Sequence, residues 1–272
     1  MTKRDDAQAI HSDTKYVFDN AGSQTPLRFG ALAALFDKAT TQRLEELGVT
    51  EGWRCLEVGA GPGSIAVWLS DRVGRSGEVV ATDIDTRFLD RIAKPNLKVL
   101  RHDLTTEPFP EKAFDLVHTR LVIEHLPQPD EVLRKLVSAV KFGGCLLVEE
   151  FDACSIRPDP ATNAAEVVLK TYLAMLHVMT ERGVDLDYGR FLPSQLRSLS
   201  LVDVTAQGRL SMWSGGSPGA HLLRANFEQI RDPMIATGLI TEHEFEQDLA
   251  RLNDPDFLMP SPIMWSVSGR RP

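Results

Sequence analysis

Between residues 53 and 152 the chain alternates short apolar runs with segments of helix length. The runs read RCLEVGA, GEVVATDID, LKVLRHD, AFDLVHTRL and GCLLVEEFD. Strands that are separated by helices usually pair in parallel, so this alternation predicts a doubly wound α/β sheet with ligands at the carboxyl ends of its strands. For 272 residues we expect one such domain with an insertion, and not two independent domains.

The segments on either side of this alternation differ in character. In the first 50 residues, the stretch PLRFGALAALFDKATTQRLEELG has apolar residues at helical spacing and ends at Gly48, so we predict an N-terminal helical cap at 1–50. Residues 51–272 are then the main domain. Within it, residues 160–182 read as a long apolar-striped helix, which predicts a helical insertion at about 153–200. SLVDVTAQGRL and PIMWSVSGRRP read as two late strands.

Charge and composition exclude several classes of partner. The net charge is −8 without a basic tract, which argues against nucleic acid or an anionic membrane surface as the main partner. No signal-peptide core or long apolar run is seen, so we expect a cytosolic (cytoplasmic) location. Cys55, Cys145 and Cys154 lack CxxC spacing; we interpret them as reduced thiols and expect no metal site. A small molecule is the expected partner, and a homodimer is left open.

The first apolar run leads into the glycine-rich turn of CLEVGAGPGSIAVWL. Gly59, Gly61 and Gly63 follow the spacing G-x-G-x-G, and Ser64 stands where a dinucleotide-binding turn has its third glycine. Glu57 precedes the first glycine by two residues, and an acid there would repel a pyrophosphate. The turn therefore favours a ligand that is cationic or neutral at this end, such as the sulfonium and ammonium groups of S-adenosylmethionine.

Acids follow the next two strands. Asp83 ends the second run and is our choice to accept both ribose hydroxyls, with Asp85 as the solvent-facing alternative. NAD-dependent enzymes use the same device, so this feature does not discriminate. Asp103, just past the third run, can accept the exocyclic amine of adenine, with the Leu104 amide available to a ring nitrogen.

In the order of these motifs the sequence resembles the class I S-adenosylmethionine-dependent methyltransferases, over roughly residues 50–152. The resemblance implies a Rossmann-like doubly wound seven-stranded sheet whose last strand is antiparallel, and PIMWSVSGRRP fits that strand. It also implies S-adenosylmethionine as cofactor, converted to S-adenosylhomocysteine. The insertion departs from the family core and is expected to shape the acceptor pocket, as in the small-molecule, natural-product branch. The implied cofactor-binding residues are Glu57, Gly59, Ala60, Gly61, Gly63, Asp83, Ile84, Asp103, Leu104, Arg120 and Leu121.

Two N-terminal residues complete the predicted cofactor site. The methionine carboxylate needs a cationic or hydroxyl partner when it is shielded from water. Tyr16 and Arg28 precede the first strand in segments that can fold over the cofactor, so we assign them this role. The alternative for Arg28 is a solvated side chain on the capping helix.

Methyl transfer is an in-line displacement in which alignment supplies most of the acceleration, so a base is needed only when the acceptor is a poor nucleophile. Our order of candidates for that base is His125, then Glu150, then Glu124, all near strand ends. His177, on a helix with Met175, reads as a core or pocket-wall residue.

These patterns predict methyl transfer to a small-molecule acceptor in secondary metabolism. An NAD-dependent oxidoreductase, disfavoured by Ser64 and Glu57, and a non-catalytic cofactor-binding scaffold remain as alternatives. The acceptor, and whether its oxygen, nitrogen or carbon is methylated, stay open.

Overall fold

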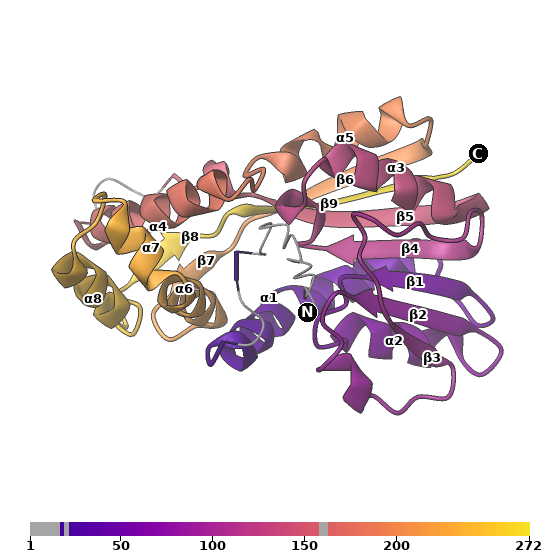
Figure 1. The fold of residues 1–272 in the computed structure, drawn as a ribbon, viewed down its shortest axis with the longest axis horizontal. Coiled ribbons are helices and arrows are strands. Elements are labelled where there is room, and N and C mark those ends of the chain that lie inside the picture. The colour runs from indigo at the N-terminus through magenta and orange to yellow at the C-terminus, as the bar shows by residue number, and fades with distance from the viewer. Residues whose placement is uncertain (1–16, 19–21, 158–162) are drawn as a thin grey trace, which may run out of the picture.

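A computed structural model describes residues 17–18, 22–157 and 163–272 of the chain. Its main feature is a seven-stranded sheet with the order β3-β2-β1-β4-β5-β9-β6 (Figure 1). The five predicted runs form parallel strands, and β9 pairs antiparallel with both β5 and β6. The predicted sheet with an antiparallel last strand is thus confirmed. The strands are β1 (Arg54–Val58), β2 (Glu78–Asp83), β3 (Leu97–Arg101), β4 (Phe114–Arg120), β5 (Val140–Asp152), β6 (Val202–Arg209) and β9 (Ile263–Arg270).

Helices cover both faces of this sheet. On one face α2 (Ser64–Val73) buries Ile65 and Leu69 against the strands, together with Leu44 of the first helix. On the other face, α3 (Pro129–Ala139) and α5 (Tyr188–Ser198) bury their apolar sides in a second cluster. Short 3₁₀ turns follow the strands: η1 (Leu89–Arg91), η2 (Ile123–His125) and η3 (Ala153–Ser155).

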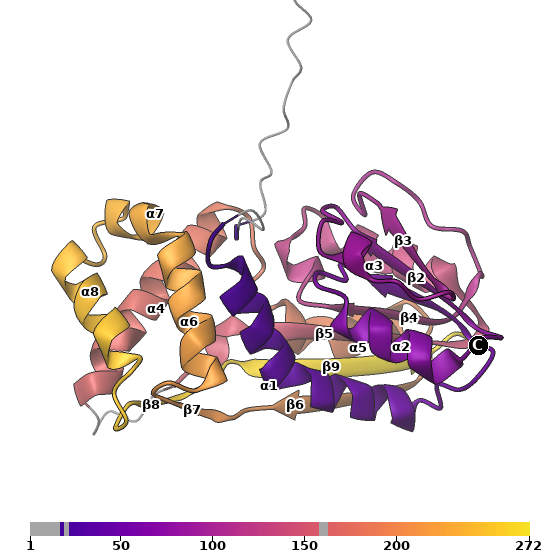
Figure 2. The same cartoon turned by 90° about the horizontal axis from the view of Figure 1, so that it is seen from below.

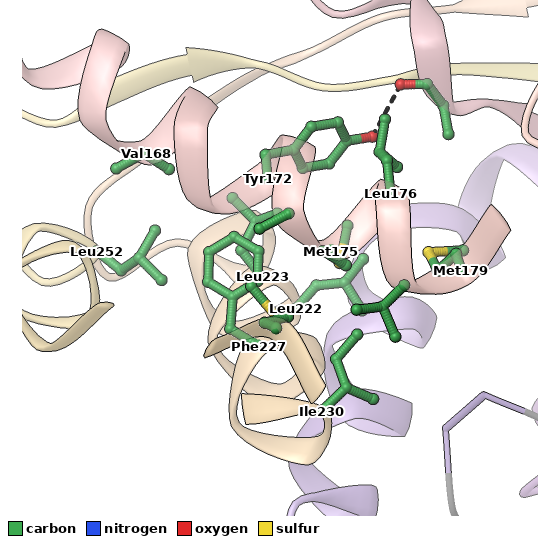
Figure 3. Packing of buried hydrophobic residues seen from close by; sticks show 14 of the residues in the cluster. Val168, Tyr172, Met175, Leu176, Met179, Leu222, Leu223, Phe227, Ile230 and Leu252 are labelled. Atoms are coloured by element: carbon green, nitrogen blue, oxygen red, sulfur yellow. Dashed lines mark hydrogen bonds between the residues drawn. The ribbon is translucent and has the colours of Figure 1, made fainter. Parts of the chain in front are cut away.

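A helical lobe lies beyond the carboxyl ends of the parallel strands (Figure 1). It contains α4 (Asn163–Glu181), α6 (Pro218–Gln229), α7 (Arg231–Ala236) and α8 (Glu242–Arg251), with a hairpin of β7 (Met212–Ser214) and β8 (Leu258–Pro260). Figure 3 shows Tyr172, Met175 and Met179 of α4 facing Leu222 and Leu223 of α6 across its core. The lobe thus draws on residues 212–260 as well as on the predicted insertion, and α5 of that insertion packs on the sheet instead.

The N-terminal helix α1 (Thr25–Glu46) bridges the lobe and the sheet (Figure 2). It ends just before Gly48, whose φ of +87° breaks the helix, as the sequence predicts. Leu32, Leu35 and Phe36 pack against the lobe, whereas Leu44 belongs to the core under the sheet. One helix therefore contacts both walls of the space between the sheet and the lobe. Within the described residues, no helix is both long and apolar enough to cross a membrane.

Candidate active site

The loop between β1 and α2 presents its backbone at the sheet edge. All three glycines have positive φ, but only two are packed tightly: an added Cβ would lie 2.2 Å from Val122 Cγ2 at Gly59 and 2.4 Å from Ile92 Cδ1 at Gly63. At Gly61, among the described residues, a Cβ would meet only the Phe29 ring, at 3.6 and 3.8 Å. Gly59 and Gly63 thus serve packing, whereas an added Cβ at Gly61 would make only ordinary contact with the Phe29 ring.

Asp83 is tied to this loop. Its Oδ2 accepts the Gly61 N–H at 2.9 Å and its Oδ1 accepts the Asp85 N–H at 3.0 Å. Each carboxylate oxygen keeps a further lone pair for a ribose hydroxyl. Burial raises the pKa of Asp83, whereas the hydrogen bond from Arg87 lowers that of Asp85. Asp83 therefore faces the loop, and Asp85 is engaged elsewhere. Ile84, 56% exposed, offers an apolar surface beside them.

Asp103 lies at the same edge, because the His102 N–H donates to the Asp83 carbonyl at 3.0 Å. The Asp103 Oδ1 accepts the Thr105 N–H at 2.9 Å and its hydroxyl at 2.6 Å, which lowers the pKa of Asp103. Asp103 thus caps its own loop and stays ionised. Leu104 beside it is buried. The structure brings both predicted acids together at one end of the glycine loop.

Two predicted cofactor residues direct their side chains elsewhere. Glu57 is buried, and its Oε2 lies 2.6 Å from His118 Nδ1 on the neighbouring strand. Arg120 donates to Asp37 and Thr40 of α1, at 2.8 and 2.9 Å. Both side chains extend from the sheet face that α1 covers, so a role at the cofactor is left to their backbones. Tyr16 lies outside the described residues.

A partly open cavity adjoins this edge between the sheet and the lobe. Leu121 follows β4, at the predicted methionine position, and lines the cavity. Most of the wall is apolar and comes from the lobe, including Met175 and Trp213. A polar corner consists of Arg28, Glu124, His125 and Asn226. His177 is exposed, so the expectation that it forms core or pocket wall is wrong.

Arg28 is placed in that corner by its own contacts. Its Nε donates to the Asn226 Oδ1 at 3.0 Å, and its guanidinium lies 4.7 Å from the centre of the Phe18 ring. The side chain is 5% exposed, so it is not the solvated arginine of the alternative interpretation. Its charge faces the cavity beside Glu124 and His125.

Glu124 and Glu150 each accept hydrogen bonds from the backbone of the segment that carries the other, at the ends of β4 and β5. Glu150 Oε1 accepts the N–H groups of Val122 at 3.2 Å and Ile123 at 2.8 Å, and Glu124 Oε2 accepts the Phe151 N–H at 3.2 Å. Burial raises the pKa of both, to about 8 for Glu150, and the charge of Glu150 adds to the rise at Glu124. Glu150 Oε2 has no hydrogen-bond partner among the described residues. The pair therefore retains a proton near neutral pH.

His125 differs from the expectation for a base near neutrality. Burial and the charge of Arg28 lower its pKa to about 3, so the imidazole is neutral. Its Nε2 lies 3.4 Å from Glu124 Oε1, and Phe18 packs edge-to-face on the ring. His125 and Glu124 reach the cavity, whereas Glu150 does not line it.

Comparison with known proteins agrees with this geometry. Residues 56–148 match the family model described as a methyltransferase domain. The ubiquinone/menaquinone biosynthesis C-methyltransferase UbiE of Azotobacter vinelandii is 32% identical over 130 residues, which cover 45% of this chain and 50% of that protein. UbiE of Pseudomonas entomophila is 34% identical over 116 residues, covering 40% and 45%. The chain thus spans about half the length of the curated relatives it matches.

Solved structures share the fold across more of the chain. Phosphoethanolamine N-methyltransferase 2 of Haemonchus contortus, in complex with phosphomonomethylethanolamine and S-adenosylhomocysteine, has a TM-score of 0.57 at 16% identity and covers 92% of this chain and 58% of that one. A protein of Anabaena variabilis, assigned to antibiotic biosynthesis as a methyltransferase, has a TM-score of 0.59 at 15% identity and covers 85% and 96%. At these identities the likeness concerns the fold. The family match, the strand order and the glycine loop together show that the chain carries a class I S-adenosylmethionine-dependent methyltransferase domain.

Proposed function

We propose that this protein transfers a methyl group from S-adenosylmethionine to a largely apolar small molecule bound in the cavity between sheet and lobe. The observation that carries this proposal is the position of the cavity. It meets the predicted methionine end of the cofactor site at Leu121, and its wall is apolar except for one corner. Such a pocket orients a ligand by a few polar groups within an apolar enclosure.

The residues at the sheet edge fit the cofactor. Asp83 would accept the ribose hydroxyls, Asp103 and the Leu104 amide would meet the adenine, and Ile84 would pack on its ring. At Gly61 an added Cβ would meet only the Phe29 ring among the described residues, so the backbone there is less crowded than at Gly59 and Gly63. Arg28 would pair with the methionine carboxylate. S-adenosylmethionine, when bound, supplies a methyl group activated by its sulfonium. In the in-line displacement this methyl group goes to the acceptor and the thioether of S-adenosylhomocysteine is the leaving group.

The chain's own contribution to the chemistry is alignment, exclusion of water and, for an acidic acceptor, removal of a proton. We place Glu124 ahead of His125 for the last task. In its ionised form, a carboxylate whose pKa is raised by burial is a stronger base than an ordinary one, whereas an imidazole with a pKa of about 3 is weak. Glu150 then holds the turn that carries Glu124.

The relatives support two acceptor chemistries. UbiE is named as a C-methyltransferase and the Haemonchus contortus protein as an N-methyltransferase. The apolar wall of the cavity favours an apolar acceptor, methylated on a carbon as in the first kind or on a hydroxyl oxygen. A place in secondary metabolism remains part of the proposal.

Thermal unfolding tests the cofactor first. S-adenosylhomocysteine at about 100 times its dissociation constant should stabilise the fold by about 2.7 kcal/mol, and NADH should not. Stabilisation by NADH instead would favour the oxidoreductase. Binding of S-adenosylhomocysteine without methyl transfer to any of a broad set of apolar phenols, enols and amines would favour the scaffold.

The proton acceptor is tested by Glu124→Gln. With a hydroxyl or carbon-acid acceptor, this change should lower turnover about a hundredfold and leave the affinity for S-adenosylhomocysteine unchanged. Glu131→Gln, an exposed change on α3, is the matched control. Normal turnover of Glu124→Gln would mean that alignment alone suffices.

A further inference from the structure

A row of buried charged residues lies beneath the catalytic edge, on the face of the sheet that α1 covers. His118 of β4 stands between two carboxylates: Nδ1 is 2.6 Å from Glu57 Oε2 on β1, and Nε2 is 3.4 Å from Glu149 Oε2 on β5. The three side chains are at most 5% exposed. His118 is not among the residues predicted from the sequence, although a histidine at an inward position of an apolar strand is a visible signal.

This row continues into α1. The Thr40 hydroxyl donates to Glu149 Oε2, and Arg120 Nη1 donates to the Thr40 oxygen at 2.9 Å. The other nitrogen of Arg120, Nη2, donates to Asp37 Oδ1 at 2.8 Å. Thr40 is therefore the joint between the charged row of the sheet and the helix, and it is 1% exposed.

The charges of the row support one another. Burial alone would lower the pKa of His118, but the charges and hydrogen bonds of Glu57 and Glu149 raise it to about 9. Burial alone would raise the pKa of Glu149. The hydrogen bonds of His118 and Thr40 and the charges of His118 and Arg120 outweigh burial and lower this pKa to about 2. An imidazolium thus lies between two carboxylates, with Arg120 and Asp37 as the outer pair. Such a buried set is costly to interrupt, because the remaining charges lose their partner.

The same helix carries the residues that contact the site. Phe29 lies over Gly61, and Arg28 and Leu32 line the cavity. They precede Thr40 by eight to twelve residues, about 12 to 18 Å along a helix. A helix that pivots at Thr40 would move its first turns away from the loop.

We propose that His118, Glu149, Thr40 and Arg120 form a latch that holds α1 over the glycine loop, so that residues beneath the sheet set the affinity for the cofactor. These are positioning residues, because their side chains act through α1. The proposal rests on the proposed function, since it takes S-adenosylmethionine as the ligand of the loop.

Thr40→Val tests the latch with little change in volume. It removes the hydroxyl joint and leaves the pairs of His118 within the sheet in place. We expect the dissociation constant of S-adenosylhomocysteine, measured by calorimetry, to rise about tenfold, which is the effect of losing one hydrogen bond to a charged group. Amide hydrogen exchange in the first turns of α1 should become faster.

Three further variants separate positioning from general stability. Thr40→Ser retains the hydroxyl and should restore the affinity to within about threefold of the wild type. Thr41→Val is the matched control, because its hydroxyl bonds only to the Lys38 carbonyl among the described residues and faces away from the row. If Thr40→Val does not fold, Arg120→Lys replaces it: the charge stays, but one ammonium cannot span Thr40 and Asp37 as the guanidinium does.

The outcomes are distinguishable. Wild-type protein that does not bind S-adenosylhomocysteine overturns the proposed function, and the latch with it. Wild-type binding with equal affinity in folded Thr40→Val overturns the latch alone. Equal losses in Thr40→Val and Thr40→Ser also overturn it, because the hydroxyl would then have no part.

Discussion

At the scale of single residues, the glycine loop shows that one motif can contain glycines of two kinds. Gly59 and Gly63 are required by neighbouring side chains, whereas Gly61 is required by its φ of +52°, and an added Cβ there would touch only the Phe29 ring among the described residues. The sequence predicts the motif but not this division, because the crowding comes from Val122 and Ile92, which are distant in the chain. Only the fold brings them to the loop.

Gly61→Val should abolish binding of S-adenosylhomocysteine while the protein stays folded. The side chain would crowd the surface of the loop beside the Phe29 ring, where we expect the cofactor, and a β-branched residue at a φ of +52° costs on the order of 1 to 3 kcal/mol. Gly48→Val, at a φ of +87° with nothing near its Cβ, carries similar strain away from the loop and should bind normally. Calorimetry on both folded variants decides; unchanged affinity in Gly61→Val contradicts the loop assignment.

The ribose acid can be separated from its neighbour. Asp83→Ala should weaken the binding of S-adenosylhomocysteine by about 1.5 to 3 kcal/mol, the usual contribution of hydrogen bonds to a charged group. Asp85→Ala should matter much less, because Asp85 pairs with Arg87 at 2.5 Å and does not touch the loop. A larger loss from Asp85→Ala would move the ribose site to that residue.

At the scale of elements, the helices were easier to predict than the surfaces they contact. The apolar spacing of α1 and its stop at Gly48 were readable from the sequence. Its polar contacts with β4 and β5 were not, because Glu57, His118 and Glu149 become neighbours only through the strand order. For the same reason Glu57 was assigned to the loop that follows it, when its partner is on the adjacent strand.

Helix α4 should determine acceptor affinity and not cofactor affinity. Met175 lines the cavity, so Met175→Ala should raise the Michaelis constant for the acceptor severalfold and leave that for S-adenosylmethionine unchanged. His177 is two positions later, about 200° around the helix, and is exposed. His177→Ala is therefore the control and should change neither constant. Equal changes in both constants for Met175→Ala would indicate a structural role.

At the scale of the whole molecule, the order of motifs along the chain was sufficient to predict the parallel strands, and the family resemblance implied the antiparallel last strand. The acceptor cavity could not be predicted from the order of motifs. Its wall combines Phe18, Leu121, Met175, Trp213 and Asn226, from segments without a shared motif. Their meeting depends on a lobe completed by residues 212–260, which the sequence did not separate from the main domain.

The pH dependence of stability is also a property of the whole molecule. The pKa of Glu150 is raised from 4.5 to about 8, so its contribution is complete below pH 4.5 and is lost as pH rises through 8. The pKa of His118 is raised from 6.5 to about 9, so its contribution is lost between those values. His125, lowered from 6.5 to about 3, acts in the opposite direction on the acid side. We expect the melting temperature to be highest near pH 5 to 6.5 and to fall toward pH 9.

Glu150→Gln isolates one part of this fall. The amide oxygen can still accept the N–H groups of Val122 and Ile123, but the side chain no longer ionises. At pH 5, where Glu150 is protonated, the variant and the wild type should melt within a few degrees of each other. At pH 9 the wild type must bury a charge, so the variant should gain about 1 to 3 kcal/mol relative to it. The exposed Glu131→Gln should follow the wild type throughout. Melting curves of Glu150→Gln and wild type that stay parallel from pH 5 to 9 would show that the pair at the strand ends does not retain its proton.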